Sequence, residues 1–168
     1  MFSFKKYISE SRIGPVYHGT DKSFNKFEVG APTSSGVKSK GIFFTKSPEV
    51  ASGYGDNVIK AYIKMDDEVV FDFRRKSRFD FDGKSRSPSE LVNRISEIND
   101  DLKRGYGLSD ETESDLVFEL RDAGWDELSG LDTIDGVVMK NVDDSMNAFG
   151  GKITDHYVVF SPNQIKKA

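Results

Sequence analysis

The pattern of hydrophobic and polar positions predicts strands toward both ends of the chain. Short apolar or alternating runs bounded by glycine, proline and serine are typical of strands. The predicted strands span residues 15–20, 41–45, 58–64, 68–73, 136–140 and 157–160. Because strands crowd both ends and helical patterns fill the middle, the sequence predicts an α+β fold with mainly antiparallel sheets.

Three helices are expected between these strands. Ser47 before Pro48 is typical of a helix start, since serine accepts from exposed N–H groups and proline suits the first helical position. This helix would be short and end near Gly53. A capping box at residues 87–90 predicts a second helix, and a third is expected over residues 109–124. The second helix has one apolar face, formed by Leu91, Ile95, Ile98 and Leu102.

Polar segments and the length of the chain predict how the domain is organised. Segments rich in glycine, serine and other polar residues predict loops over residues 30–40, 77–87 and 141–152. Residues 1–12 place aromatic and aliphatic side chains among charges, which predicts a tail or a docking segment. A chain of 168 residues fits one domain, here residues 13–168.

Composition excludes several classes of protein. The chain has no cysteine and two histidines, which excludes a disulfide scaffold, thiol catalysis and a multi-histidine metal site. A net charge of −4 argues against non-specific DNA binding. The basic cluster at residues 74–78 is interpreted as a solvated loop, with a phosphate contact as the alternative. No apolar run is long enough for a membrane helix, and the N-terminus lacks the apolar core of a secretory signal, so we expect a cytoplasmic protein.

Three short stretches are candidates for chemistry. His18 at a strand end is followed by Gly19, which leaves the backbone open for close approach by a ligand. Tyr54 lies between two glycines and can offer its ring face to a planar ligand, although it can equally be a helix-end residue. Near the C-terminus, Gln164 is either functional or a cap of the final turn.

Taken together, these stretches resemble the ADP-ribosyltransferase superfamily, in the branch of poly-ADP-ribose polymerases and diphtheria toxin. Residues 18–20 match its His-Gly-Ser/Thr motif, and residues 41–44 match its Gly-Ile-Tyr-Phe strand with Phe43 in place of the usual tyrosine. Tyr54 matches the second tyrosine, and residues 157–160 match the last strand. The surrounding sequence is also similar to small transferase domains of tailed phages and bacterial polymorphic toxins.

The resemblance implies a split pair of mainly antiparallel sheets around an NAD cleft, with helices inserted in the middle of the chain. By analogy, Gly19 would bond the nicotinamide amide, His18 would bond a ribose hydroxyl, and Thr20 could add a hydroxyl contact. Tyr54 would stack on the nicotinamide ring, with Phe43 closing the other side. The implied cofactor-binding residues are Tyr17, His18, Gly19, Thr20, Phe43, Thr45 and Tyr54.

The main departure from the family pattern is at the catalytic acid. The family has a glutamate where this chain has His156, with Asp155 one residue earlier. A neutral imidazole can accept the hydrogen bond of a ribose hydroxyl but adds no negative charge. Neighbouring strand residues face opposite sides, so Asp155 cannot replace His156 without a bulge. The implied catalytic residues are His18, Tyr54, His156 and Asp155, and Gln164 would shape the acceptor side.

The resemblance implies an NAD-dependent mono-ADP-ribosyltransferase that modifies a host protein or nucleic acid and releases nicotinamide. It would act without a metal, as a phage or toxin effector in the host cytoplasm. Three alternatives stay open: a binding module for NAD or a nucleotide with weak or no turnover, an enzyme that only hydrolyses NAD, and a virion structural component. His156 and Phe43 favour the binding module.

Overall fold

The computed structural model describes residues 12–24, 26–29, 41–74, 78–87, 90–91, 93–94, 97, 134–143 and 152–168. Several predicted segments lie outside this part of the chain. They are the N-terminal segment, the loop over residues 30–40, the helix over residues 109–124 and most of the loop over residues 141–152. The third helix therefore stays a prediction, and only the start of the second lies among the described residues.

The described strands form one sheet of nine strands. They are β1 (Ile13–Thr20), β2 (Ile42–Thr45), β3 (Asn57–Ile63), β4 (Glu68–Asp72), β5 (Phe79–Phe81), β6 (Lys84–Arg86), β7 (Gly136–Asp143), β8 (Ile153–Val159) and β9 (Ile165–Lys167). Their order in the sheet is β6-β5-β4-β7-β8-β2-β1-β3-β9. Among these strands only the β4–β7 pair is parallel, which confirms the predicted antiparallel character.

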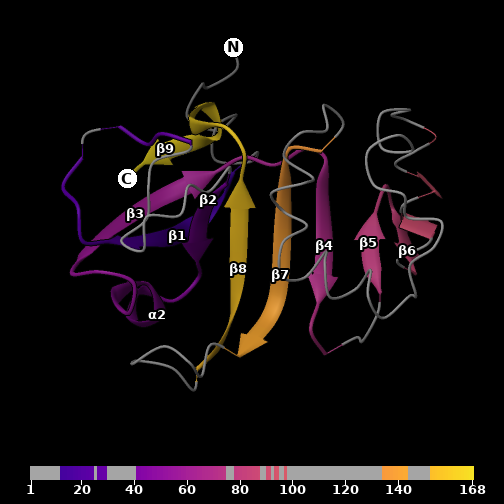
Figure 1. Cartoon of the computed structure of the whole chain (residues 1–168), viewed down its shortest axis with the longest axis horizontal. Helices are drawn as coiled ribbons and strands as arrows, with labels where there is room; N and C mark the ends of the chain where they lie inside the picture. Colours follow the sequence, from indigo (N-terminus) through magenta and orange to yellow (C-terminus); the bar gives the residue numbers. More distant parts are fainter. Residues whose placement is uncertain are drawn as a thin grey trace, which may run out of the picture.

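The prediction of two separate sheets is wrong for the described strands, because β2 pairs with both β8 and β1. The two halves are nevertheless joined at one narrow place. β1 and β2 share a single register pair, Tyr17 with Thr45, whereas β2 pairs with β8 along all four of its residues. Figure 1 shows that β1 and β3 run across the direction of β7 and β8. The sheet therefore bends at the β1–β2 contact.

Strand alternation gives the sheet two apolar faces, named here after neighbouring residues of β2. The Phe43 face carries buried residues of the β4–β7–β8 half, namely Val69, Phe71, Phe79, Phe81, Val137 and Val158, with Leu91 and Ile134 packed beside them. The Phe44 face carries a second cluster that extends over β1 and β3, including Val16, Ala61, Ile63, Tyr157 and Val159. Burial on both faces explains the nearly continuous apolar run of residues 157–160.

The short helix predicted after residue 47 is confirmed as α2 (Pro48–Ser52). The Ser47 hydroxyl accepts a hydrogen bond from the backbone N–H of Val50 at 3.3 Å. It also donates to the Glu49 carboxylate at 2.7 Å, and this contact is the largest cause that lowers the pKa of Glu49 to about 2. Figure 1 shows α2 in the half of the sheet that contains β1, β2 and β3.

Residues 77–87 were predicted as a loop, and that prediction is wrong over most of its length. They contain the hairpin of β5 and β6, with Phe79 and Phe81 buried in the core. The turn places Asp82 and Gly83 at positive φ, 53° and 72°, as a tight hairpin turn requires. Alternation of phenylalanine with Asp80, followed by Asp-Gly, is the sequence signal for this hairpin.

The capping box that follows the hairpin is confirmed. Glu90 accepts a hydrogen bond from the backbone N–H of Ser87 at 3.0 Å, and the hydroxyl of Ser87 accepts from that of Glu90 at 3.3 Å. Residues 90, 91, 93, 94 and 97 are helical, and Leu91 is fully buried. The described residues therefore confirm the start of the second helix.

Candidate functional site

His18 lies on β1, beside the place where the β1–β2 pairing ends. Its ring nitrogen Nδ1 is 2.7 Å from the backbone oxygen of Phe43. Because a carbonyl oxygen can only accept, Nδ1 carries the proton, and Nε2 of the neutral ring is left as an acceptor. Burial lowers the pKa of His18, and the hydrogen bond to Phe43 opposes this effect. The environment therefore favours a neutral imidazole with one defined tautomer.

Aromatic side chains hold the His18 ring on the Phe44 face. The ring centroid of Phe27 is 5.3 Å away with an edge-on geometry, and that of Phe44 is 5.7 Å away. Phe24 adds a second edge-on contact at 6.1 Å and packs on Phe27 at 4.9 Å. Edge-to-face contacts of this kind contribute about 0.5–1.5 kcal/mol each. Sequence reasoning did not place Phe24 and Phe27 in the site, although they follow the His-Gly motif closely.

Gly19 is placed where α2 crosses β1. A Cβ atom on Gly19 would overlap the carbonyl oxygen of Ala51 and lie 3.3 Å from Cβ of Tyr54. The close approach that this glycine permits is therefore made by the main chain of α2, and a close approach by a ligand stays a prediction. The same contact places Tyr54 beside Gly19, and 53% of the Tyr54 surface is exposed to solvent.

Thr20, the last residue of β1, also lies against the segment that follows α2. A Cβ on Gly55 would overlap the main chain of Thr20, so the segment after α2 lies against the end of β1. The Thr20 hydroxyl accepts a hydrogen bond from the backbone N–H of Lys22 at 3.1 Å. The residues predicted for the first motif and the second tyrosine are thus neighbours in space.

Phe43, Thr45 and His156 share the other face of the sheet. Phe43 is half-buried against the core cluster of the Phe43 face, and Thr45 is the register partner of both Tyr17 and His156. Thr45 is buried, and its hydroxyl accepts from the backbone N–H of Ser47 at 3.3 Å. His156 is buried at 8% exposure and lies on the Phe43 face by strand alternation. His18 and His156 therefore lie on opposite faces of the sheet.

Asp155 has a structural contact that separates it from His156. Its carboxylate accepts a hydrogen bond from the backbone N–H of Asn141 at 3.0 Å. Asn141 adopts a left-handed conformation, with φ of 58°, inside the register shift between β7 and β8. Asp155 therefore stabilises the bulge in the neighbouring strand, and alternation turns it away from the face of His156.

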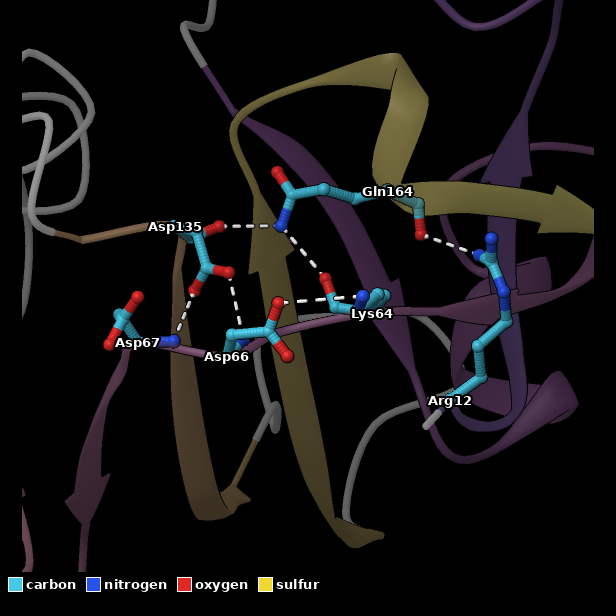
Figure 2. Close-up of polar contacts among 6 residues, drawn as sticks. All are labelled: Arg12, Lys64, Asp66, Asp67, Asp135 and Gln164. Atoms are coloured by element: carbon cyan, nitrogen blue, oxygen red, sulfur yellow. Dashed lines mark hydrogen bonds and ion pairs between the residues drawn. The ribbon is translucent and has the colours of Figure 1, made fainter. Parts of the chain in front are cut away.

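Gln164 ties together three segments, as Figure 2 shows for its contacts with Lys64, Asp135 and Arg12. Its side-chain oxygen accepts from the backbone N–H groups of Phe160 and Ser161 at 3.1 and 2.9 Å. Its side-chain nitrogen donates to the backbone oxygens of Lys64 and Asp135 at 2.9 and 2.7 Å. Both amide protons and both acceptor positions of the side chain are used in these contacts, which include a capping box with Ser161. The role of Gln164 on the acceptor side stays a prediction.

Asp135 completes the network of Figure 2. Its two carboxylate oxygens accept from the backbone N–H groups of Asp66 and Asp67 at 2.7 and 2.9 Å. The backbone oxygen of Gln164 also accepts from the guanidinium of Arg12 at 3.0 Å. These contacts join the start of β7 to the β3–β4 connection and to the C-terminal turn.

A cavity of about 480 Å³ lies beside β4 and β5. It is lined by Asp66, Asp67, Glu68, Val70, Asp80, Phe81, Asp82, Gly83 and Arg94, and by none of the predicted site residues. The described residues contain no group of three or more histidine, aspartate or glutamate side chains that could hold a metal ion. Within the same part of the chain, no helix is long and apolar enough to cross a membrane.

Comparison with known proteins identifies the family of the chain. A family model described as "ADP-Ribosyltransferase in polyvalent proteins" matches residues 10–168. No curated protein and no solved structure matches the chain. The mostly β-sheet architecture is consistent with the ADP-ribosyltransferase fold, and the family match covers nearly the whole chain. The chain therefore belongs to the family of ADP-ribosyltransferase domains found in polyvalent proteins.

Proposed function

We propose that the protein is an NAD-dependent mono-ADP-ribosyltransferase. The observation that carries the proposal is the grouping of Gly19 with Tyr54 where the β1–β2 pairing ends, in a chain of this family. In the reaction, the bond between nicotinamide and the ribose breaks, and nicotinamide leaves with the bonding electrons. An acceptor nucleophile forms the new bond to the same ribose carbon and releases its proton.

His18 would bind substrate through the nitrogen that the main chain leaves available. With Nδ1–H committed to the Phe43 oxygen, Nε2 accepts from a ribose hydroxyl and fixes the pose of the dinucleotide. The lowered pKa of His18 keeps this acceptor unprotonated near neutral pH. Tyr54, half-exposed beside Gly19, would supply a ring face for the nicotinamide.

His156 lies on the face of the sheet opposite to His18, and it would limit the rate of the reaction if it faces the ribose. Positive charge develops on the ribose as the glycosidic bond breaks, and catalysis requires contacts that strengthen with that charge. His156 is buried, and a neutral imidazole there would accept a hydrogen bond but supply no negative charge. Asp155 is committed to the β7 bulge. We therefore propose single-unit transfer at a modest rate and no chain elongation.

A second candidate function follows from the same residue. With an imidazole in place of a carboxylate, the domain would bind NAD, or an ADP-ribose-like nucleotide, without turnover. The two candidates would use the same binding residues, and they differ only in whether nicotinamide is released.

The acceptor and the cellular setting belong to the proposal as well. The match to domains of polyvalent proteins supports a phage-type effector that modifies a host protein or nucleic acid in the host cytoplasm. NAD serves as co-substrate, and we propose no metal in the reaction.

The test is incubation of the purified protein with NAD and a bacterial lysate, followed by chromatography of free nicotinamide. The control variant is Lys166→Met, on β9 and away from the proposed pocket. We expect nicotinamide release by the wild type and by the control, and none by His18→Ala. NAD binding measured by calorimetry without nicotinamide release would select the second candidate. Absence of both binding and release would refute both functions.

A further inference from the structure

Lys167, on the C-terminal strand β9, reaches the aromatic residues that hold His18. It pairs in register with Ala61 of β3, and Ala61 pairs with Val16 of β1, so all three lie on the Phe44 face. The Nζ atom of Lys167 is 5.4 Å from the ring centroid of Phe24 and 5.6 Å from that of Phe27. Both distances are within the range of a cation–π contact.

A hydrogen bond supports the same arrangement. Lys167 Nζ donates to the backbone oxygen of Phe24 at 3.4 Å. One ammonium group thus contacts both rings and the main chain of the segment that carries them. Phe24 and Phe27 in turn pack edge-on against His18, at 6.1 and 5.3 Å.

We propose that Lys167 is a positioning residue that acts through Phe24 and Phe27 to hold the His18 ring on the main-chain oxygen of Phe43. Its importance for NAD rests on the proposed function. The structural part of the proposal does not, because it concerns the orientation and tautomer of His18 in the protein without substrate.

The physical reason is the geometry of a single hydrogen bond. His18 Nδ1 is 2.7 Å from the Phe43 oxygen, and a small rotation of the ring about its side-chain bonds would break this contact. The neighbouring rings limit that rotation. When the ammonium group is removed, the Phe24–Phe27 segment loses its anchor, and the imidazole can turn and exchange its tautomer.

The direct test is nitrogen-15 NMR of the imidazole rings, without NAD, at a pH well above the unperturbed histidine pKa of about 6.5. The chain has two histidines, so in a His156→Gln background all imidazole signals come from His18. We expect His18 to be the Nδ1–H tautomer in this background. Lys167→Met keeps an unbranched apolar side chain and removes the charge. When it is added, the chemical shifts of both ring nitrogens should move toward the values of a tautomer mixture. Lys167→Arg should restore the original signals.

Lys166→Met is the matched control, since Lys166 is the adjacent residue of β9 and lies on the opposite face. It should leave the His18 signals unchanged. Unchanged His18 signals in Lys167→Met, or an Nε2–H tautomer before any lysine is changed, would overturn the proposal.

NAD binding gives the second measurement, made with His156 in place. Loss of the exposed cation–π contacts of Lys167 should raise the Kd for NAD roughly twofold to fivefold in Lys167→Met, with recovery in Lys167→Arg. If the wild type binds no NAD while the NMR signals respond to Lys167→Met, the proposed function fails and the positioning role stands. If NAD binds and Lys167→Met neither alters the NMR signals nor weakens binding, the positioning role fails and the proposed function stands.

Discussion

Substitution of Gly19 by alanine gives the sharpest test of how α2 is seated on β1. An added Cβ would overlap the Ala51 oxygen and lie 2.7 Å from the Ala51 carbonyl carbon. To reach ordinary van der Waals contact, that carbon must retreat by about 0.7 Å, and the oxygen by more. The clashing atoms are main chain of a capped helix that packs through buried Val50 and Ala51, so they cannot rotate away as a flexible side chain would.

Overpacking commonly lowers the free energy of unfolding by about 1–3 kcal/mol. Because the atoms that clash in Gly19→Ala belong to the main chain, we expect a loss at or above the upper end of this range. A loss of about 3 kcal/mol lowers the midpoint of urea unfolding by about 1.5 M at a typical dependence of about 2 kcal/mol per molar. The displacement also moves Tyr54, so we expect NAD binding to disappear in calorimetry even where the variant is folded.

Gly83→Ala is the matched control for this experiment. Nothing lies within 4 Å of a Cβ at this position, and its φ of +72° leaves only the backbone cost of about 1 kcal/mol. Its NAD affinity should equal that of the wild type. If Gly19→Ala unfolds at the wild-type urea concentration and retains NAD affinity, the packing of α2 against β1 is wrong.

Four further outcomes are expected. Gln164→Met removes four hydrogen bonds and should lower the free energy of unfolding by about 3 kcal/mol, measured by thermal or urea unfolding; an unchanged midpoint would contradict the network of Figure 2. The pKa of His18 is lowered in the folded protein, so the unfolded chain binds the proton first, and His18 should lower stability as pH falls from about 6.5 toward its folded pKa. His18→Gln should remove this part of the pH dependence, and an identical slope in both proteins would count against the burial of His18. Tyr54→Ala should weaken NAD binding by about 1 kcal/mol or more while Tyr54→Phe retains it, since the ring face supplies the contact; equal losses would point to the phenol instead. His156→Glu should raise the rate of nicotinamide release if this position faces the ribose, and a rate equal to or below wild type would exclude that placement.

The local features of the site were predictable from the sequence because they depend on local chemistry. Ser47 before Pro48 specifies the start of α2, and the capping box at residues 87–90 specifies the next helix start. Alternation along β8 predicted that Asp155 and His156 face opposite sides, and Asp155 is indeed committed to Asn141 of β7.

Long-range partners were not predictable from one sequence. Gly19 signals a close approach, but only the fold shows that the Ala51 main chain makes it. Gln164 satisfies groups 29 and 100 residues away in the sequence, and no local pattern specifies them. The division into two sheets failed because β2 pairs on both of its edges. The hairpin of β5 and β6 was missed because its polar residues outweighed the alternation of Phe79 and Phe81.

Covalent transfer of label from NAD is the most direct test of the proposed transferase activity. The protein is incubated with NAD radiolabelled in its adenylate part and with a bacterial lysate, and the macromolecular fraction is treated separately with protease and nuclease. We expect labelled macromolecules with the wild type and none with His18→Ala, with one of the two treatments releasing the label. Intact NAD and an unlabelled macromolecular fraction with the wild-type protein would contradict transferase activity.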